Sequence, residues 1–232
     1  MIYVMSDIHG QYDQYAEMLS KIGFSGKDTL YVLGDVIDRG KDGIKILFDM
    51  MNRFNVVPML GNHEYMAYKV LSKLNVEITE DNYDSHLDYK TLISWQDWLS
   101  NGGVATQEAF TALHHSGRRK ILEYLCEFTV YEELTVGDTD YILAHAGLGN
   151  FSAERPLYDY AIEEFVWDRA DYSRKYFDNK ILITGHTPTF MIDEACRGKI
   201  IRKNNHIAID CGVVYGEKLG CICLDTQEEF YV

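Results

Sequence analysis

The chain has 232 residues, of which 47% are hydrophobic and 13% aromatic, so it can bury a sizeable core. Its formal net charge of −14 argues against broad nucleic-acid binding, which needs a basic surface to neutralise phosphates. No charged and apolar leader is present and no apolar stretch reaches roughly 18 residues, so neither a signal peptide nor a membrane interaction is expected. The five Cys show no zinc-ligand spacing, which favours reduced thiols in a cytoplasmic protein.

The first third of the chain alternates expected strands and helices. Strands are predicted at 2–5, 30–33 and 56–60, where short apolar runs occur. Between them, apolar residues recur at helical spacing over 12–22 and 44–51. This order predicts a parallel sheet with right-handed crossovers.

The rest of the chain reads as a helical insert followed by more strands. Residues 65–127 are predicted to be mainly helical, with one helix that buries Leu92, Trp95 and Leu99 and ends at Asn101-Gly102-Gly103. A later helix is expected at 158–166. Further strands are expected at 128–134, 141–144, 181–184, 199–202, 207–210 and 220–224.

These short, closely spaced strands predict a second sheet that is more antiparallel than the first. No linker-like tract divides the chain, so one domain over 1–232 is expected. The predicted fold class is α/β, with two facing mixed β-sheets flanked by helices in four layers, α/β/β/α, and the helical insert at 65–127.

Metal-binding residue types follow the most apolar predicted strands. In open α/β sheets, ligands bind at the carboxyl ends of strands, so these loops can converge on one site. One Asp or His after a strand is more often a turn former, but five such loops, each containing Gly, are hard to obtain from folding needs alone. The loops are Ser6-Asp7-Ile8-His9-Gly10, Gly34-Asp35-Val36-Ile37-Asp38-Arg39-Gly40, Gly61-Asn62-His63-Glu64, His145-Ala146-Gly147 and Gly185-His186-Thr187-Pro188.

The residue types in these loops suit two divalent metal ions. Asp7 and His9 can reach one cation, and the Asp35 carboxylate can bridge two cations roughly 3.5–4 Å apart. The set has no thiolate, which favours Mn²⁺, with Fe or Zn²⁺ as alternatives. A hydroxide that bridges the ions would attack phosphorus directly. Neutral ligands for the second ion are supplied by Asn62, His145 and His186.

Three neighbouring residues complete a phosphoesterase site. His63 is placed to protonate a leaving alkoxide, and Asp38 is the carboxylate that orients this imidazole and keeps it cationic. Arg39 can donate two parallel hydrogen bonds to phosphate oxygens.

These motifs closely resemble the phosphoprotein phosphatase family within the calcineurin-like metallophosphoesterases, in order and spacing from residue 7 to 188. The resemblance implies one metal bound by Asp7, His9 and Asp35. It implies a second metal bound by Asp35, Asn62, His145 and His186. It also implies His63 and Asp38 as the catalytic pair, with the substrate phosphate held by Arg39, Asn62 and Arg169.

Arg169 is carried over because a phosphate-binding Arg usually follows a Trp after the His-Ala-Gly motif, as in Trp167-Asp168-Arg169. An exposed Arg paired with Asp168 is the alternative. The short length and the segments 98–103 and 209–212 look like the bacterial and phage branch of the family. Asp210 itself is expected to be a turn residue.

Three functions remain open at this point. The main expectation is a protein phosphatase that acts on phosphoserine, phosphothreonine and, as an extension, phosphotyrosine in proteins or peptides. The alternative is a hydrolase of dinucleoside polyphosphates of the diadenosine tetraphosphate (Ap4A) type, for which 65–127 offers Trp95, Trp98 and the basic run 118–120. A non-catalytic scaffold is the third, although such proteins typically lose ligands that are all present here. The sequence indicates no oligomeric state.

Overall fold

The computed structural model describes residues 1–76, 79–82 and 88–232, and in them the strands form two five-stranded sheets. The first sheet has the order β10-β9-β1-β2-β3. Strands β1, β2 and β3 are parallel to one another, as expected, but β9 and β10 extend this sheet in the antiparallel direction. The bounds are β1 (Ile2–Met5), β2 (Thr29–Val32), β3 (Val56–Pro58), β9 (Gly220–Cys223) and β10 (Glu229–Tyr231).

The second sheet has the order β4-β5-β6-β8-β7. Its central strands β5, β6 and β8 are parallel, and β4 and β7 pair antiparallel at the two edges. The expectation of a more antiparallel second sheet is therefore wrong, because long crossovers return the chain to the same edge between β5, β6 and β8. The bounds are β4 (Tyr131–Val136), β5 (Thr139–Ala144), β6 (Lys180–Thr184), β7 (Ile201–Lys203) and β8 (His206–Ala208).

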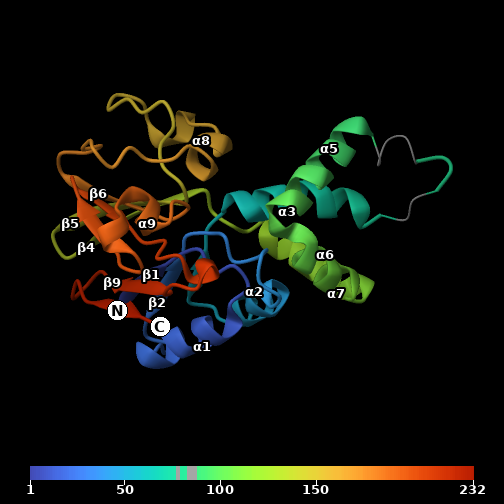
Figure 1. Ribbon diagram of the computed structural model, residues 1–232, viewed down its shortest axis with the longest axis horizontal. Helices are drawn as coiled ribbons and strands as arrows, with labels where there is room; N and C mark the ends of the chain where they lie inside the picture. The colour runs from blue at the N-terminus through green and yellow to red at the C-terminus, as the bar shows by residue number, and fades with distance from the viewer. Residues whose placement is uncertain (77–78, 83–87) are drawn as a thin grey trace.

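The two mixed sheets face each other and helices lie outside them, which confirms the α/β/β/α fold class (Figure 1). The buried cluster between the sheets includes Val4, Leu143, Ile183 and Ile222. Helices α1 (Tyr12–Lys21) and α2 (Gly43–Met51) pack on the outer face of the first sheet. The outer face of the second sheet is covered by α8 (Ile162–Val166) and adjoining loops.

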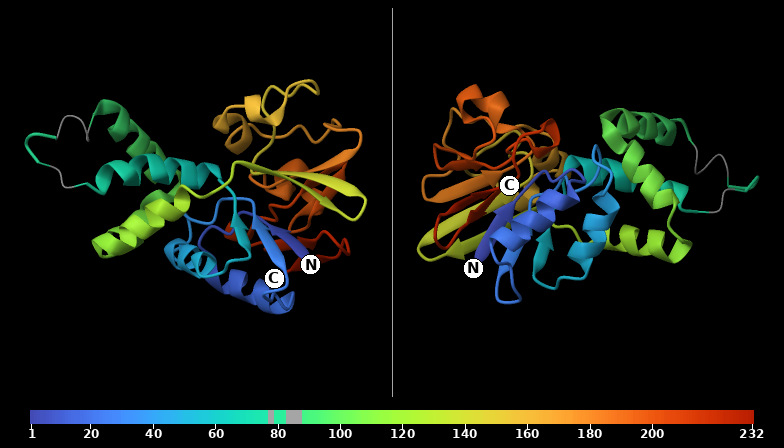
Figure 2. Two further views of the ribbon diagram at one scale, coloured as in Figure 1. Left: turned by 180° about the vertical axis from the view of Figure 1, so that it is seen from behind. Right: turned by 60° about the horizontal axis from the view of Figure 1, so that its bottom comes forward.

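A helical segment separates β3 from β4 and extends away from the sheets (Figures 1 and 2). The prediction of a helical insert over 65–127 also covers residues 77–78 and 83–87, which lie outside the described residues. None of the helices in the described ranges is long and apolar enough to cross a membrane. The segment contains α3 (Asn62–Leu74), α5 (Tyr89–Trp98), a π-turn (Leu99–Gly103), α6 (Val104–Thr111) and α7 (His115–Leu125).

The helix predicted to end at Asn101-Gly102-Gly103 instead continues through a kink. Gly102 has a φ of 107°, and α6 begins directly after the π-turn. The buried face also differs, because Trp98 is fully buried whereas Leu92 is 45% exposed. Helix α5 packs against α3 on its Trp98 side, while Trp95 and Leu99 of the predicted face are half-buried against the core and only Leu92 lies outside.

Two smaller expectations are also corrected. Within the helix expected at 158–166, only Ile162–Val166 is α-helical, and a 3-10 turn (Leu157–Asp159) precedes it. Strand β10 was not predicted, because its three residues carry no clear alternation. The remaining short helical turns are α9 (Thr189–Ile192), Glu194–Cys196 and Val213–Tyr215.

Candidate active site

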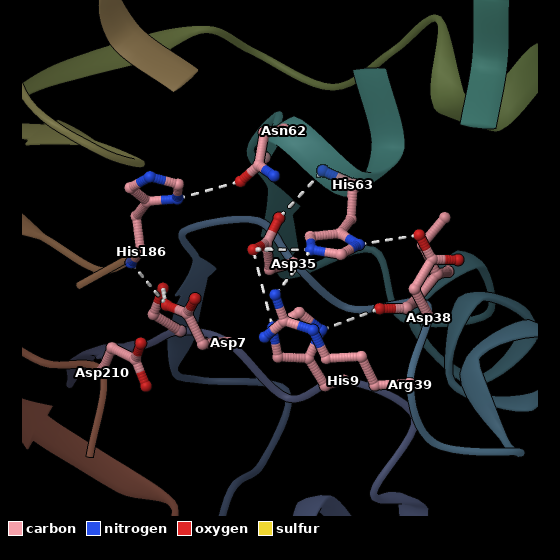
Figure 3. A network of polar contacts seen from close by, with 12 residues as sticks. Asp7, His9, Asp35, Asp38, Arg39, Asn62, His63, His186 and Asp210 are labelled. Carbon is pink, nitrogen blue, oxygen red and sulfur yellow. Dashed lines mark hydrogen bonds and ion pairs between the residues drawn. The ribbon is translucent and has the colours of Figure 1, made fainter. Parts of the chain in front are cut away.

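The loops at the carboxyl ends of β1, β2, β3, β5 and β6 meet in one place (Figure 3). We call them the strand-end loops: residues 6–10, 34–40, 61–64, 145–147 and 185–188. Asp35 lies at their centre, with His9, His63 and His145 around its carboxylate. The convergence expected from strand-end placement is therefore present in the structure.

The backbone of these loops is held in left-handed conformations. Positive φ angles occur at Asp7 (54°), His9 (46°), Asp35 (52°) and His186 (61°), where L-residues are strained. Main-chain hydrogen bonds between neighbouring loops stabilise them, such as the 2.9 Å bond from the His9 N–H to the Asp35 carbonyl. Such strain concentrates at functional sites, where it aims side chains that a regular strand would point elsewhere.

Glu64 is a positioning residue whose role the sequence reasoning missed. Its fully buried carboxylate accepts hydrogen bonds from the backbone N–H groups of Asp35, Val36 and Ile37, at 2.8, 2.8 and 3.2 Å. It also accepts from the N–H of Gly61 at 3.1 Å. Glu64 thus connects the loop after β2 to the start of α3. Its position directly after Asn62-His63 was the one feature of the sequence that could have indicated this role.

Asp35, Asn62, His145 and His186 form one group of donor atoms. The Asn62 Oδ1 lies 3.0 Å from His145 Nε2 and 2.9 Å from His186 Nδ1. His145 Nε2 is 3.4 Å from Asp35 Oδ1. Because oxygen and nitrogen atoms converge from separate elements at these distances, the group fits one divalent cation.

The second group lies on the other side of Asp35 and contains His9. His9 Nε2 is 3.6 Å from Asp35 Oδ2. Asp7 reaches the site from below in Figure 3, and its Oδ2 accepts hydrogen bonds from the Ser6 hydroxyl and the His186 backbone N–H. The six sequence-predicted metal ligands are therefore brought together around Asp35.

The imidazoles are oriented as in metal-binding histidines. His9 Nδ1 donates to the carbonyl of Ile37 at 3.0 Å, and His145 Nδ1 donates to the carbonyl of Leu33 at 2.6 Å. Each ring therefore presents Nε2 toward Asp35, and a backbone acceptor behind a ring is the usual support for a ligating imidazole. These residues fit a pair of divalent ions.

Burial and charge set the pKa values of these groups. Burial works to raise the pKa of Asp35, but His145 and His63 outweigh it and hold that pKa well below its usual value. Burial opposes the charged form of His145, yet Asp35 raises the pKa of this imidazole to about 10. Burial lowers the pKa of His186 to about 3. A cation that binds His145 must displace a proton, so metal binding is coupled to pH.

His63 and Asp38 form the expected pair. His63 Nδ1 lies 2.7 Å from Asp38 Oδ2, and both side chains are fully buried. Burial works to lower the pKa of His63, but Asp35 and Asp38 outweigh it and raise that pKa. The same Asp38 oxygen accepts a hydrogen bond from Trp98 Nε1 at 2.8 Å, a contact that sequence reasoning missed because Trp98 lies 60 residues away.

Arg39 lies beside the donor group that contains His9 and beside His63. Its guanidinium nitrogens are 2.9 Å from His9 Nε2 and 3.1 Å from His63 Nε2. Its backbone N–H donates to the Gly102 carbonyl at 2.9 Å, and a Cβ on Gly102 would lie 2.7 Å from Arg39 Cγ. Glycine in the π-turn therefore lets the helical segment press on the loop that carries Arg39.

Arg169 lies at the opposite edge of the site. It is exposed and its Nη1 approaches Met191 Sδ at 4.0 Å, while its charge contributes to the low pKa of His186. Asp210 lies beside Asp7 (Figure 3), and its Oδ1 accepts the Gly212 N–H at 2.9 Å, which is the turn expected from sequence.

Residues 1–190 match the family model described as calcineurin-like phosphoesterase, which covers most of the chain and every strand-end loop. The chain belongs to the calcineurin-like phosphoesterases. It is accordingly a metal-dependent phosphoesterase, and the donor groups around Asp35 could hold its divalent ions.

Similar curated proteins carry one name. A bis(5'-nucleosyl)-tetraphosphatase, symmetrical, of Wigglesworthia glossinidia brevipalpis is 37% identical over 98 residues, which are 40% of this chain and 36% of that protein. The protein of that name from Chromobacterium violaceum is 32% identical over 142 residues, or 59% of this chain and 48% of its own length. The chain thus aligns with less than half the length of these relatives.

Solved structures agree on the fold. A chain described as a putative diadenosine tetraphosphatase is 17% identical, with a TM-score of 0.68 over 100% of this chain and 92% of its own. A serine/threonine phosphatase of Saccharomyces cerevisiae is 14% identical, with a TM-score of 0.55 over 100% and 79%. At such identities the likeness concerns the fold alone.

The expectation of a serine/threonine protein phosphatase is overturned by the curated relatives, whose names support the dinucleotide alternative. The physical reason is that the residue types in the strand-end loops suit metals and a phosphoryl group, which protein and dinucleotide substrates share. The metal motifs therefore identify the reaction class without identifying the remainder of the substrate.

Proposed function

We propose that this chain hydrolyses dinucleoside polyphosphates, splitting a substrate of the diadenosine tetraphosphate type into two nucleoside diphosphates. The observation that carries the proposal is the shared name of its curated relatives, which are symmetrical tetraphosphatases. The geometry supports it with two donor groups that share Asp35, and with the Arg39 guanidinium 2.9 Å from His9 Nε2 in one of them. Such a site suits a phosphoanhydride whose cleaved centre carries dense negative charge.

The residues divide the work of this reaction among them. Bound divalent ions, for which we propose Mn²⁺, would polarise the phosphoryl group and lower the pKa of a water. Arg39 and Arg169 approach from opposite edges to bind phosphate oxygens, and the Asn62 amide, beside His145 and His186, faces the same space. Asp38 holds His63 in the orientation that lets its Nε2 face the leaving oxygen.

The proposed substrate changes what His63 must do. Water contributes its hydroxyl to one β-phosphorus and its proton to the departing nucleoside diphosphate. A phosphate oxygen leaves as a much weaker base than an alkoxide, so little proton donation is needed. His63 therefore contributes chiefly positive charge near the cleaved bond when the substrate is a phosphoanhydride.

The proposal is tested by hydrolysis of diadenosine tetraphosphate and a phosphothreonine peptide side by side, with Mn²⁺ supplied and then chelated. We expect a higher kcat/KM on the dinucleotide, ADP as the sole nucleotide product, and loss of both activities on chelation. A higher kcat/KM on the peptide, or release of AMP and ATP, would contradict the proposal.

A further inference from the structure

A cavity of about 270 Å³ lies between the helical segment and the chain that follows α8. Its size is a little below the roughly 300 Å³ at which small-molecule sites begin, so it suits one nucleoside rather than a whole dinucleotide. The cavity is lined by Tyr65, Met66, Lys69, Ser94, Asp97, Asn101 and Trp167.

One wall of this cavity continues directly from the metal groups along α3. Asn62 begins this helix, and Tyr65, Met66 and Lys69 follow at the spacings that place residues on one helix face. The rise of the helix puts Tyr65 and Lys69 roughly 5 and 10 Å beyond Asn62 along its axis. A ligand whose phosphate lies at Asn62 can therefore extend along α3 into the cavity.

The other walls also border the active site. The Trp167 ring centroid lies 6.4 Å from that of His186, in the edge-to-face arrangement. Asn101 directly precedes Gly102, whose carbonyl accepts the Arg39 backbone N–H. The cavity therefore borders the donor group that contains His186 and the loop that carries Arg39.

The cavity's side chains match the chemistry of a nucleoside attached to phosphates. Trp167 is 37% exposed, so an indole face is available for a base to stack on. Lys69 Nζ lies 3.7 Å above the Tyr65 ring and 3.9 Å from a Glu163 oxygen, and the Tyr65 hydroxyl donates to the same Glu163. The cavity thus contains the Tyr65 ring, which Lys69 and Glu163 fix in place, the partly exposed Trp167 ring and the Lys69 ammonium group.

Polar groups line the floor between the two rings. The Asp97 carboxylate can accept hydrogen bonds from an exocyclic amine of a base, and Asn101 Nδ2 donates to the Asp97 carbonyl at 2.8 Å, so its Oδ1 is the amide atom left to accept one. Carboxylate and amide oxygens would repel a phosphate, whereas they suit the amine edge of adenine. Phosphate is therefore favoured at the Lys69 end and the base at the Trp167 end.

We propose that this cavity is a nucleoside subsite, which stacks one base on Trp167 and places the adjoining α-phosphate near Lys69. The inference rests on the proposed function. With one base there and the α-phosphate between Lys69 and Asn62, the next phosphate along the chain can lie at the donor groups around Asp35. Cleavage at that phosphate yields a nucleoside diphosphate, so the subsite accounts for a symmetrical split of a tetraphosphate.

The test compares Trp167→Leu and Lys69→Met with matched controls on the same elements. Tyr158→Leu removes an exposed ring from the chain before α8, and Lys73→Met removes an exposed ammonium one turn further along α3. For each protein with Mn²⁺, kcat/KM is measured on diadenosine tetraphosphate and on p-nitrophenyl phosphate. ADP is also measured as a competitive inhibitor of p-nitrophenyl phosphate hydrolysis.

We expect Trp167→Leu to lower the ratio of the two kcat/KM values about 10–100-fold through KM, the usual effect of losing a stacked base. The Ki of ADP should rise in parallel, Lys69→Met should show a smaller effect of the same kind, and both controls should keep the wild-type ratio. If the wild type hydrolyses the dinucleotide and Trp167→Leu changes neither the kcat/KM ratio nor the Ki of ADP, the subsite is overturned and the proposed function stands. If the wild type is inactive on the dinucleotide, the proposed function is overturned. The Ki of ADP then tests the subsite by itself: a rise in Trp167→Leu supports it and an unchanged value overturns it.

Discussion

The strand-end loops hold their ligand atoms with backbone contacts, whereas the helices of the helical segment, in its described residues, present their side chains by packing on one another. In the loops, left-handed residues such as His9 and Asp35 are fixed by the main-chain hydrogen bond between them and by the Glu64 carboxylate, which accepts the Asp35 N–H. In the helical segment, Trp98 reaches Asp38 only because α5 lies against α3.

This difference separates two layers of function. In the proposed function, the loops bind the metals and the phosphoryl group, and the metal chemistry is the same for any phosphoester. The helices and the chain after α8 line a neighbouring cavity, where we expect substrates to be distinguished. A change in a metal ligand of the loops should therefore affect all substrates alike, and a change in the helices should affect them unequally.

Among variants in the strand-end loops, Asp35→Asn should lower activity the most. Asp35 faces both donor groups, so loss of its charge weakens both metals, and we expect kcat/KM to fall at least about 10³-fold on every substrate. Activity on the dinucleotide and on p-nitrophenyl phosphate, with metal content by elemental analysis, checks this. Asp138→Asn, exposed at the opposite end of β5, is the matched control. A loss confined to one substrate would break the comparison.

His63→Asn tests whether one residue of the loops can discriminate by leaving group. We expect a loss of about 10²–10⁴-fold on alkyl phosphates, the usual contribution of a general acid. On p-nitrophenyl phosphate, whose leaving group needs no proton, the loss should be much smaller. Rates on a series of phosphate esters with graded leaving-group pKa provide the measurement. Equal losses across the series would contradict the acid role.

Trp98→Phe tests the hydrogen bond by which the helical segment reaches the Asp38 carboxylate. Loss of the indole N–H leaves Asp38 Oδ2 with one donor fewer in a fully buried site, so we expect alkyl phosphate turnover to fall about 10-fold. The free energy of unfolding should fall by about 1–3 kcal/mol, measured by urea denaturation. Trp95→Phe, which loses only a bond to Gln107 on the same segment, is the control. If it matched Trp98→Phe in turnover, the contact would have no special role.

The strand-end loops could be predicted from sequence because their signal is local. A buried strand followed at once by Asp, His or Asn with Gly marks each loop, and the shared edge of the sheets brings the loops together. Most strands were predicted within a few residues for the same reason. The mixed order of the second sheet was missed, because strand direction depends on crossovers that no short motif encodes.

The substrate side could not be predicted because its signal is distributed. Apolar spacing in α5 correctly suggested that Trp95 packs on the core, but it gave no sign that Trp98 hydrogen-bonds Asp38. The basic run 118–120 was expected to be a solvated helix face, and the Arg119 guanidinium pairs with Glu123 on the exposed side of α7. The cavity between Tyr65 and Trp167 joins residues about a hundred positions apart, and no sequence motif connects them.

His206, which lies outside both regions, is expected to show the smallest effect, a pH-dependent change in stability. It lies within β8 and stacks on Tyr172 at 4.6 Å, with no carboxylate partner, and burial alone lowers its pKa to about 3. His145, in the same sheet but beside Asp35, has its pKa raised instead. The unfolded chain binds a proton at His206 below pH about 6.5 and the folded chain does not, so acid removes stability in this window.

His206→Phe keeps the stacking on Tyr172 and removes the titration, and the Thr184 hydroxyl retains its contact with the Tyr172 hydroxyl at 3.2 Å. Between pH 7 and pH 5, we expect the free energy of unfolding of the wild type to fall by about 1–2 kcal/mol more than that of the variant. Urea denaturation of both proteins at each pH measures the difference. Parallel losses in the two proteins would mean that the folded chain protonates His206 as readily as the unfolded chain. The contrast between a buried imidazole with a carboxylate and one without would then not hold for this fold.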